Sequence, residues 1–339
     1  MAKHIGKQSI RFSSAPCFTA EAAVVGKKEG EGPLRERFDY ISTDSYFGEK
    51  SWEKAESTML RQCYETVLKK AGIAENDIQF LLAGDLLNQC TGSSFAAKDS
   101  TIPFLGLYGA CSTMGESLSI GAMLIDGGFA ENICAMTSSH FCSAERQFRL
   151  PLEYGGQRSP TAQWTATASG AAILSRKGIG PRITHITSGK IIDAGITDSS
   201  NMGAAMAPAA YDTLTAHFKD TGRDPGYYDA VITGDLGKFG HEILADFFQR
   251  DRLIMPKVFT DCGMLLYNIR AQDTHCGGSG CGCAASVLCA HIIKCMREGM
   301  WKRVLFAPTG ALMSPVSSMQ GESIPGICHA LAIEFLEEN

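Results

Sequence analysis

The sequence of 339 residues has no apolar run approaching the roughly 20 residues that a membrane-spanning helix needs. Its first residues, MAKHIGKQSIRFSS, also lack the apolar core of a secretory signal peptide. Positive charge is not in excess, because 31 Lys and Arg stand against 36 Asp and Glu, which gives a formal net charge of -5. We therefore expect a protein that does not bind nucleic acid and that reaches a membrane only through a partner.

Paired cysteine motifs are also lacking, although the chain contains 13 cysteines. An odd number of cysteines cannot all pair within one molecule, and a chain without a secretion signal favours free thiols. Cys276, Cys281, Cys283 and Cys289 cluster, but their segment lacks the two separated Cys-x-x-Cys pairs of a structural zinc site. We predict free thiols and no structural metal.

The most informative segment places a cysteine between a predicted strand and a predicted buried helix. Residues 104–108 favour a strand, Gly109 and Ala110 permit a tight turn, and an apolar run of helical spacing follows Cys111 until Gly127. Ser112 or Thr113 is the expected helix cap. A thiol at such an elbow lies near the positive end of the helix dipole, which lowers its pKa and attracts anions. The alternative is a packed core cysteine.

A repeat divides the chain into two related halves. The string LLAGDLLNQ at 81–89 returns as VITGDLGKF at 231–239, and HCGGSGCGCAAS at 275–286 takes the place that GACSTMGES holds in the first half. Strands and helices alternate throughout, which favours a layered α/β architecture. We predict an α/β fold of layers αβαβα with two pseudo-symmetric halves, residues 1–178 and 179–339. The two buried helices should aim their amino ends at one shared pocket.

These features together resemble the thiolase superfamily, which includes the ketoacyl-carrier-protein synthases, over nearly the whole chain. More narrowly, eight strings in order resemble the family of stage V sporulation protein AD from spore-forming bacteria. The strings are AGDLLNQ, GACSTMGES, TSSH with FCSAERQFR, EYGGQ, GITD with MGAAMAPAA, VITGDLG, GGSGCGC and TGALMSP. Each string alone is weak, and their order makes the resemblance specific.

The resemblance implies a binding protein whose ancestral catalytic pocket has become a ligand pocket. The implied ligand is dipicolinic acid, free or as its calcium chelate, taken up into the developing spore. The implied partners are membrane proteins of the same stage V sporulation group, at the cytoplasmic face of the spore inner membrane. No cofactor is implied other than calcium carried with the ligand. A homodimer through the edge strand of the first half, placed at about residues 133–137, is implied as well.

Dipicolinate is a flat pyridine with two carboxylates, so its site should offer donors at both ends and an apolar slot for the ring. The candidate ligand-binding residues lie at helix starts or just beyond predicted strands: Cys111, Ser279, His140, Arg146, Arg149, Thr309 and Ser314 for the ligand, and Asp85 and Asp235 for its calcium. Each has a structural alternative. These are a strand-end hydrogen bond for His140, Asx-type turns for the aspartates, ordinary ion pairs for the arginines, and helix-start or turn chemistry for the serines.

Catalysis is the main alternative function. A condensing enzyme needs a cysteine nucleophile together with a His/His or His/Asn pair that polarises the thioester carbonyl. Where a synthase places its first histidine, this chain has Asp235, and an ionised carboxylate repels the developing oxyanion. His275 remains as one candidate partner of Cys111. We favour a pseudo-enzyme, with an acyl-thioester condensing or acyl-transfer enzyme that uses Cys111 as the alternative, and a scaffold with a vestigial pocket as a third.

Overall fold

The computed structural model describes residues 3–147 and 158–336. The first half contains β1 (Lys3–Ile5), β2 (Ser9–Arg11), β3 (Cys17–Val25), α1 (Lys27–Gly30), β4 (Tyr40–Ile41), α2 (Trp52–Ala71), β5 (Phe80–Gly84), α3 (Thr91–Ala97), β6 (Phe104–Gly106), α4 (Thr113–Asp126), β7 (Asn132–Ser139), α5 (Phe141–Glu145), β8 (Trp164–Thr165) and β9 (Ala168–Ser175).

The second half contains β10 (Arg182–Thr187), α6 (Met202–Thr221), β11 (Ala230–Gly234), α7 (Gly237–Arg250), β12 (Val258–Asp261), α8 (Cys262–Leu266), β13 (Gly278–Ser279), α9 (Cys281–Val287), a π-helical turn (Leu288–Ile292), α10 (Ile293–Arg297), β14 (Arg303–Ala311), α11 (Pro315–Met319), β15 (Gly326–Cys328) and β16 (Ala330–Glu334).

The strand order repeats between the halves. The main sheet runs β12-β11-β14-β16-β10-β3-β9-β7-β5-β6, so β10-β16-β14-β11-β12 has the same internal order as β3-β9-β7-β5-β6. Within each of these two runs, the last strand of the half (β9 or β16) pairs antiparallel with both neighbours. The other pairs of the two runs are parallel. The two halves meet where β10 pairs with β3 at Arg182 and Cys17. The division into two domains at residues 178 and 179 stays a prediction.

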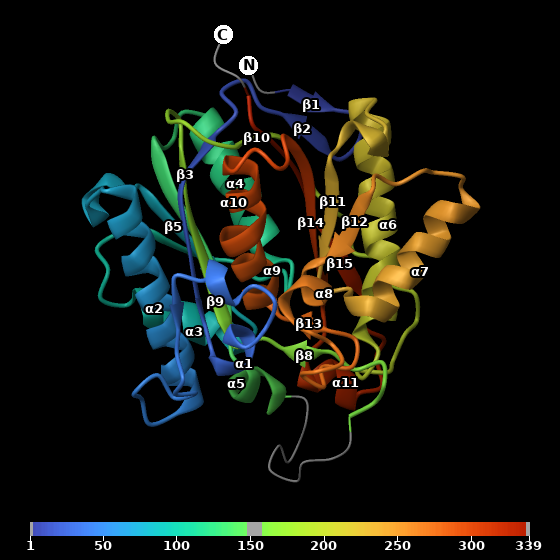
Figure 1. The fold of residues 1–339 in the computed structure, drawn as a ribbon, viewed down its shortest axis with the longest axis horizontal. Coiled ribbons are helices and arrows are strands. Elements are labelled where there is room, and N and C mark those ends of the chain that lie inside the picture. Colours follow the sequence, from blue (N-terminus) through green and yellow to red (C-terminus); the bar gives the residue numbers. More distant parts are fainter. Residues whose placement is uncertain (1–2, 148–157, 337–339) are drawn as a thin grey trace.

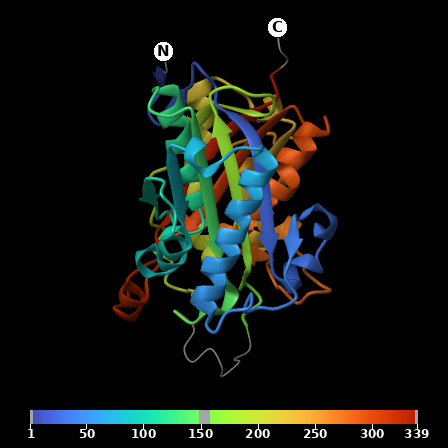
Figure 2. The ribbon, with the colours of Figure 1, turned by 90° about the vertical axis from the view of Figure 1, so that its left-hand side faces the viewer.

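Three buried apolar clusters correspond to the layers. One lies between the two halves of the sheet and includes α4, α9 and α10, whereas the other two lie under α2 and under α6 with α7. Figure 1 shows α4, α9 and α10 in the centre of the fold, with α2 on one side and α6 and α7 on the other. Figure 2 shows α2 lying across strands of the first half. This arrangement confirms the predicted layered fold.

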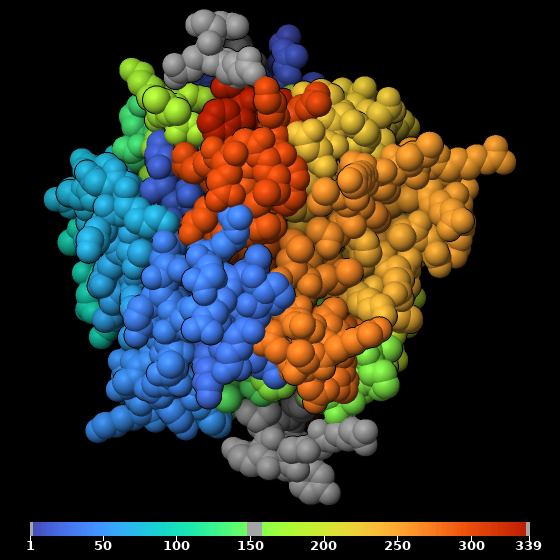
Figure 3. Space-filling view, viewed as in Figure 1, coloured from blue at the N-terminus to red at the C-terminus, as the bar shows by residue number. Residues whose placement is uncertain are grey.

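Capping residues explain where helix α2 begins and ends. Ser51 caps α2 by accepting from the Lys54 N–H, and Gly72 ends it in the left-handed region with φ 67°. Helix α4 is nearly buried all round, as its lack of a polar face predicts. It approaches β14 closely at Gly115, where a Cβ would lie 2.6 Å from Pro308 Cγ. Figure 3 shows the two halves packed along a continuous seam.

The structure corrects the predicted dimer edge. Strand β7, which contains residues 133–137, lies inside the sheet between β9 and β5. The edge strand of the first half is β6, because β5 pairs with β7 on one side and with β6 on the other. The prediction was wrong because the order of strands along the chain does not give their order in space. Within residues 3–147 and 158–336, no helix combines the length and apolar character needed to cross a membrane.

Candidate functional site

A cavity opens at the end of the fold where α5, β8, β13 and α11 lie together (Figure 1). Its empty space, counted with the mouth, is about 850 Å³. Both halves contribute side chains to its lining, among them Tyr108, Cys111, Glu145, Gln163, Ser279 and Ser314. The structure therefore brings three predicted site residues, Cys111, Ser279 and Ser314, to one cavity.

Cys111 stands on a tight elbow between β6 and α4. Ala110 adopts a left-handed conformation with φ 49°, which turns the chain sharply before the helix. The Ser112 hydroxyl donates to the Gly109 carbonyl at 2.7 Å, and the Thr113 hydroxyl donates to the Ala110 carbonyl at 2.6 Å. Both hydroxyls bond to carbonyl groups within the elbow, and neither side chain caps α4. The predicted capping role was therefore wrong.

The thiol of Cys111 is not activated by its position. Burial raises the pKa of the Cys111 thiol well above its usual range, and the Asp235 carboxyl raises it further. The Gly280 N–H opposes this shift without cancelling it. The expectation of a lowered pKa was wrong, because desolvation and a facing carboxyl outweigh the helix end.

The Gly-rich turn of the second half, residues 277–282, is fixed against the end of β7. The Thr137 hydroxyl donates to the Cys281 carbonyl at 3.0 Å, the Cys281 thiol donates to the Ser138 carbonyl at 2.9 Å, and the Gly282 N–H donates to Ser139 Oγ at 3.2 Å. These hydrogen bonds attach the start of α9 to the first half, beside the elbow of Cys111. The two helix starts converge on one cavity, as the repeat predicts.

The two aspartates at the repeated Gly-Asp-Leu exits have different surroundings. Asp85 accepts the Leu87 N–H at 2.8 Å and both the N–H and hydroxyl of Ser93 at 2.6 Å, so it ties down its own loop. Neither carboxylate oxygen of Asp235 has a hydrogen bond of ordinary geometry among the described residues, although the residue is fully buried. Burial, followed by the charge of Asp261, raises the pKa of Asp235 well above its ordinary value.

The remaining predicted ligand residues in the described part of the chain lie outside the cavity lining. His140 caps α5 by accepting the Cys142 N–H, and its other ring nitrogen donates to the Ser45 carbonyl at 2.8 Å. Arg146 pairs with Glu53 and lies over the Trp52 ring, and the Thr309 hydroxyl donates to the Gly234 carbonyl. Arg149 lies outside the described residues, and Ser314, which lines the cavity, also caps α11.

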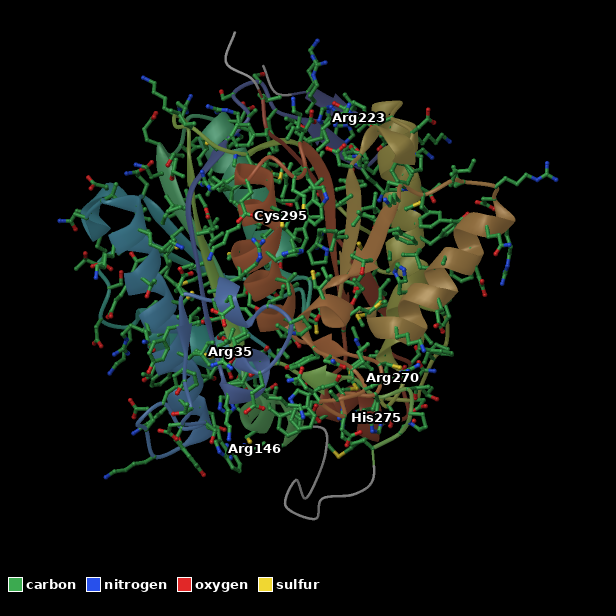
Figure 4. The ribbon with its side chains drawn as sticks, viewed as in Figure 1. Arg35, Arg146, Arg223, Arg270, His275 and Cys295 are labelled. Atoms are coloured by element: carbon green, nitrogen blue, oxygen red, sulfur yellow. The ribbon has the colours of Figure 1, made fainter. Side chains whose placement is uncertain are left out.

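His275 does not reach Cys111. Its Nδ1 lies 2.6 Å from the Ser159 carbonyl and its Nε2 lies 3.2 Å from Asp273. Figure 4 shows Arg146 and His275 on different sides of the lower end of the fold. No histidine is found among the described residues that line the cavity. The second-half groups that shift the pKa of Cys111 are the Asp235 carboxyl and the Gly280 N–H, and neither belongs to a histidine.

Sequence reasoning missed several lining residues. Glu145 is buried and accepts the Thr165 hydroxyl at 2.9 Å, and the Gln163 amide donates to the carbonyls of Asp235 at 2.6 Å and Gly278 at 3.1 Å. Residues 164 and 165 form β8, which pairs with β13 of the second half and so brings this segment to the cavity. No hydrophobic period marks such a short strand, so the sequence offers no signal for it.

Comparison with known proteins matches both the sequence and the fold. Residues 6–334 match the family model described as stage V sporulation protein AD (SpoVAD). A protein of Bacillus subtilis (strain 168) named Stage V sporulation protein AD is 43% identical over 332 residues, which cover 98% of each chain.

Solved structures with the same fold include condensing enzymes. The 3-oxoacyl-[acyl-carrier-protein] synthase III of Aquifex aeolicus VF5 superimposes with a TM-score of 0.60 at 13% identity, covering 94% of this chain and 100% of that one. A structure of Xanthomonas campestris OleA gives a TM-score of 0.61 at 13% identity, covering 94% of this chain and 98% of that one. At this identity the likeness shows the thiolase-like fold alone.

Proposed function

The chain belongs to the stage V sporulation protein AD family, and from that premise we propose that it binds dipicolinic acid, free or as its calcium chelate, in the cavity beside Cys111. Membership of the family supports a role in sporulation. The proposed role within it is uptake of the ligand into the developing spore, as a component of a transport complex at the spore inner membrane. Calcium travels with the ligand as cargo.

The lining of the cavity supports a small aromatic ligand with polar ends. Tyr108, Met202 and Met313 supply apolar surface for a ring, whereas Ser279 and Ser314 supply hydroxyl groups. Sites for small molecules combine a mainly apolar surface with a few convergent polar groups in about 300–1,000 Å³. The lining of this cavity has the same combination of apolar and polar groups.

The burial of Cys111 is the observation that carries the non-catalytic part of the proposal. A thiol whose pKa is raised by burial supplies little thiolate, and the thiolate is the form that attacks a thioester. No histidine stands among the described lining residues to accept its proton. The protein therefore binds its ligand without covalent chemistry.

The second candidate function is acyl transfer through Cys111, which the likeness to condensing enzymes favours. Incubation with acyl-CoA, followed by mass spectrometry of the peptide that contains Cys111, separates the two. Our proposal expects no adduct. An acyl group on Cys111 of the unmodified protein would support the enzyme instead.

Filling the cavity should weaken ligand binding. We expect Met202→Trp to reduce the affinity for dipicolinate by at least about tenfold, a loss of about 1.4 kcal/mol, because the indole occupies space that the ring needs. Isothermal titration calorimetry with dipicolinate and with its calcium chelate measures this change. Met319→Trp makes the same chemical change at a side chain that is 78% exposed and lies outside the lining, and should leave affinity unchanged. Absence of heat from the unmodified protein at millimolar ligand would contradict the proposal.

Contact with the membrane is proposed to run through partner proteins. The partners are membrane proteins of the same stage V sporulation group, and the chain sits at the cytoplasmic face of the inner membrane. Sedimentation of the chain with spore membranes in the presence and absence of those partners tests this. Equal sedimentation in both would contradict it.

We propose a homodimer through the edge strand β6. Leu105 on this strand is 41% exposed, and Tyr108 just beyond it is 47% exposed, so apolar surface adjoins unpaired strand backbone. Leu105→Asp is expected to shift the protein from dimer to monomer in light scattering, because it places charges in the paired edge. Phe129→Asp, at a site that is 72% exposed and lies beyond α4, is the matched control and should not. A monomeric unmodified protein would overturn the proposal.

A further inference from the structure

Gln163 reaches from the first half of the chain to two loops of the second half. It lies just before β8, is 9% exposed and lines the cavity. Its side-chain amide donates to the Asp235 carbonyl at 2.6 Å and to the Gly278 carbonyl at 3.1 Å. Asp235 follows the end of β11, and Gly278 begins β13. One side chain therefore joins two loops that lie far apart along the chain.

These two hydrogen bonds fix the orientation of the Gln163 amide. Both partners are carbonyl oxygens, which can only accept, so the amide nitrogen faces them and uses both of its hydrogens. The remaining polar atom, Oε1, is buried and has no hydrogen-bond partner among the described residues. The side chain therefore keeps no N–H group for a ligand carboxylate, and its role in the site is to hold the two loops.

The main chain around β8 binds the carbonyls on either side of Gly278. The Trp164 N–H donates to the Gly277 carbonyl at 2.8 Å, and the Ala166 N–H donates to the Ser279 carbonyl at 2.9 Å. Every second carbonyl of a strand faces its partner strand, so this ladder leaves the Gly278 carbonyl unpaired. The side-chain amide supplies the missing donor, and it thereby fixes the strand that brings Ser279 to the cavity lining.

The Asp235 carbonyl belongs to a loop that supports the start of α6. The next residue, Leu236, lies directly against Gly203 in the first turn of that helix, where an added Cβ would be 2.6 Å from the Leu236 carbonyl oxygen. Met202, the neighbour of Gly203, lines the cavity. A shift of the Asp235 carbonyl would therefore move the backbone on which Met202 rests.

We propose that Gln163 is a positioning residue, which sets the relative positions of Met202 and Ser279 in the cavity lining. It acts through the carbonyls of Asp235 and Gly278 and does not itself donate to the ligand. The inference rests on the proposed binding of dipicolinate, to which Met202 offers apolar surface for the ring and Ser279 offers a hydroxyl group.

Gln163→Met tests this assignment because it keeps the length of the side chain and removes both donors. We expect it to lower the affinity for dipicolinate by at least about tenfold, since two buried carbonyls lose their donor and the loops that carry lining residues shift. Isothermal titration calorimetry measures the affinity, and thermal unfolding verifies that the variant is folded. Gln249→Met is the matched control, because this glutamine is exposed on α7 and lies outside the cavity lining. It should leave the affinity unchanged.

Gln163→Glu adds a measurement that a general loss of stability would not change. At pH 8.5 its carboxylate can only accept and faces two carbonyl oxygens, so the affinity should again fall by at least about tenfold. At pH 5.5 the buried carboxyl regains a proton and can donate to one carbonyl. The affinity of Gln163→Glu relative to the unmodified protein should then recover by at least about threefold. The same ratio for Gln163→Met should not depend on pH.

Hydrogen exchange followed by mass spectrometry tests the link between the loops without any ligand. In Gln163→Met, residues 235–238 and 276–280 should exchange at least about threefold faster than in the unmodified protein. Exchange in α2, which lies outside these loops, should stay the same.

The possible outcomes are distinct. Unchanged affinity in folded Gln163→Met would overturn the inference and leave the proposed ligand binding intact, and so would equal affinity ratios for Gln163→Glu at the two pH values. Faster loop exchange in a protein that does not bind dipicolinate would support the link between the loops and contradict the proposed ligand. An equal loss of affinity in Gln249→Met would overturn the assignment to Gln163. Should Gln163→Met fail to fold, Gln163→Glu at the two pH values decides.

Discussion

Replacing Gly282 with alanine is expected to lower the free energy of unfolding by about 3 kcal/mol, the upper part of the range for overpacked sites. The new Cβ would lie 2.1 Å from the Ala168 carbonyl oxygen and 2.7 Å from Ser139 Oγ. Helix α9 cannot move back to relieve this contact, because Thr137 and Ser138 hold its first turn by hydrogen bonds to Cys281. Urea denaturation measures the change.

Gly226→Ala is the matched control for this substitution. A Cβ at Gly226 meets no heavy atom within 4 Å, so stability should change by less than about 0.5 kcal/mol. Equal losses in the two variants would show that the start of α9 is not clamped between the halves. The clamp matters for function because the same turn places Ser279 in the lining of the cavity.

A second large effect is expected from Glu56, an acid buried in the first half. Its oxygens accept the Ser138 hydroxyl at 3.1 Å and the Ser143 hydroxyl at 2.6 Å, which joins α2 to β7 and α5. The carboxyl groups of Glu56 and Asp85 both lie against Gly92. Burial, followed by the charge of Asp85, raises the pKa of Glu56 from its ordinary 4.5 to about 8.

Because of this shift, stability should fall as the pH rises from about 5 to about 8. In that window the folded protein holds a proton on Glu56 that the unfolded chain has lost. Below it both states hold the proton and the contribution is fully present, whereas above it both are ionised and the curve levels off. The loss is on the order of a few kcal/mol, since each pKa unit corresponds to about 1.4 kcal/mol.

Glu56→Gln should remove most of this pH dependence and make the protein more stable than the unmodified chain at pH 9. The amide keeps partners for both serine hydroxyls and carries no charge to oppose Asp85. Urea denaturation between pH 5 and pH 9 measures the effect. Glu65→Gln, on the exposed face of the same helix, is the control and should follow the unmodified curve. Parallel curves for Glu56→Gln and the unmodified chain would contradict the assignment.

The layered fold could be predicted from the sequence because its signals are local and repeated. The helical spacing after Cys111, the cap and stop of α2 at Ser51 and Gly72, and the repeated Gly-Asp-Leu exits each correspond to an element in the structure. Their order along the chain then fixes the pseudo-symmetry. The convergence of Cys111 and Ser279 on one cavity follows from that symmetry.

The electrostatics of the site could not be predicted in this way. The elbow suggested an activated thiol, but the depth of burial and the approach of Asp235 are set by contacts between distant segments. The two aspartates look alike in sequence, and only the position of Asp261 distinguishes the tied carboxylate from the unused one. The prediction of the edge strand was wrong as well, because nothing in the composition of β7 shows that two strands flank it.

The pairing of β10 indicates how the chain could be circularly permuted. Strand β2, near one end of the chain, lies along one side of β10, and strand β16, near the other end, lies along the opposite side. A peptide linker could therefore close the chain into a ring, which could be reopened between β9 and β10. Such a circular permutant would be synthesised with the second half first and would keep every strand neighbour. It would reveal which half guides the assembly of the other.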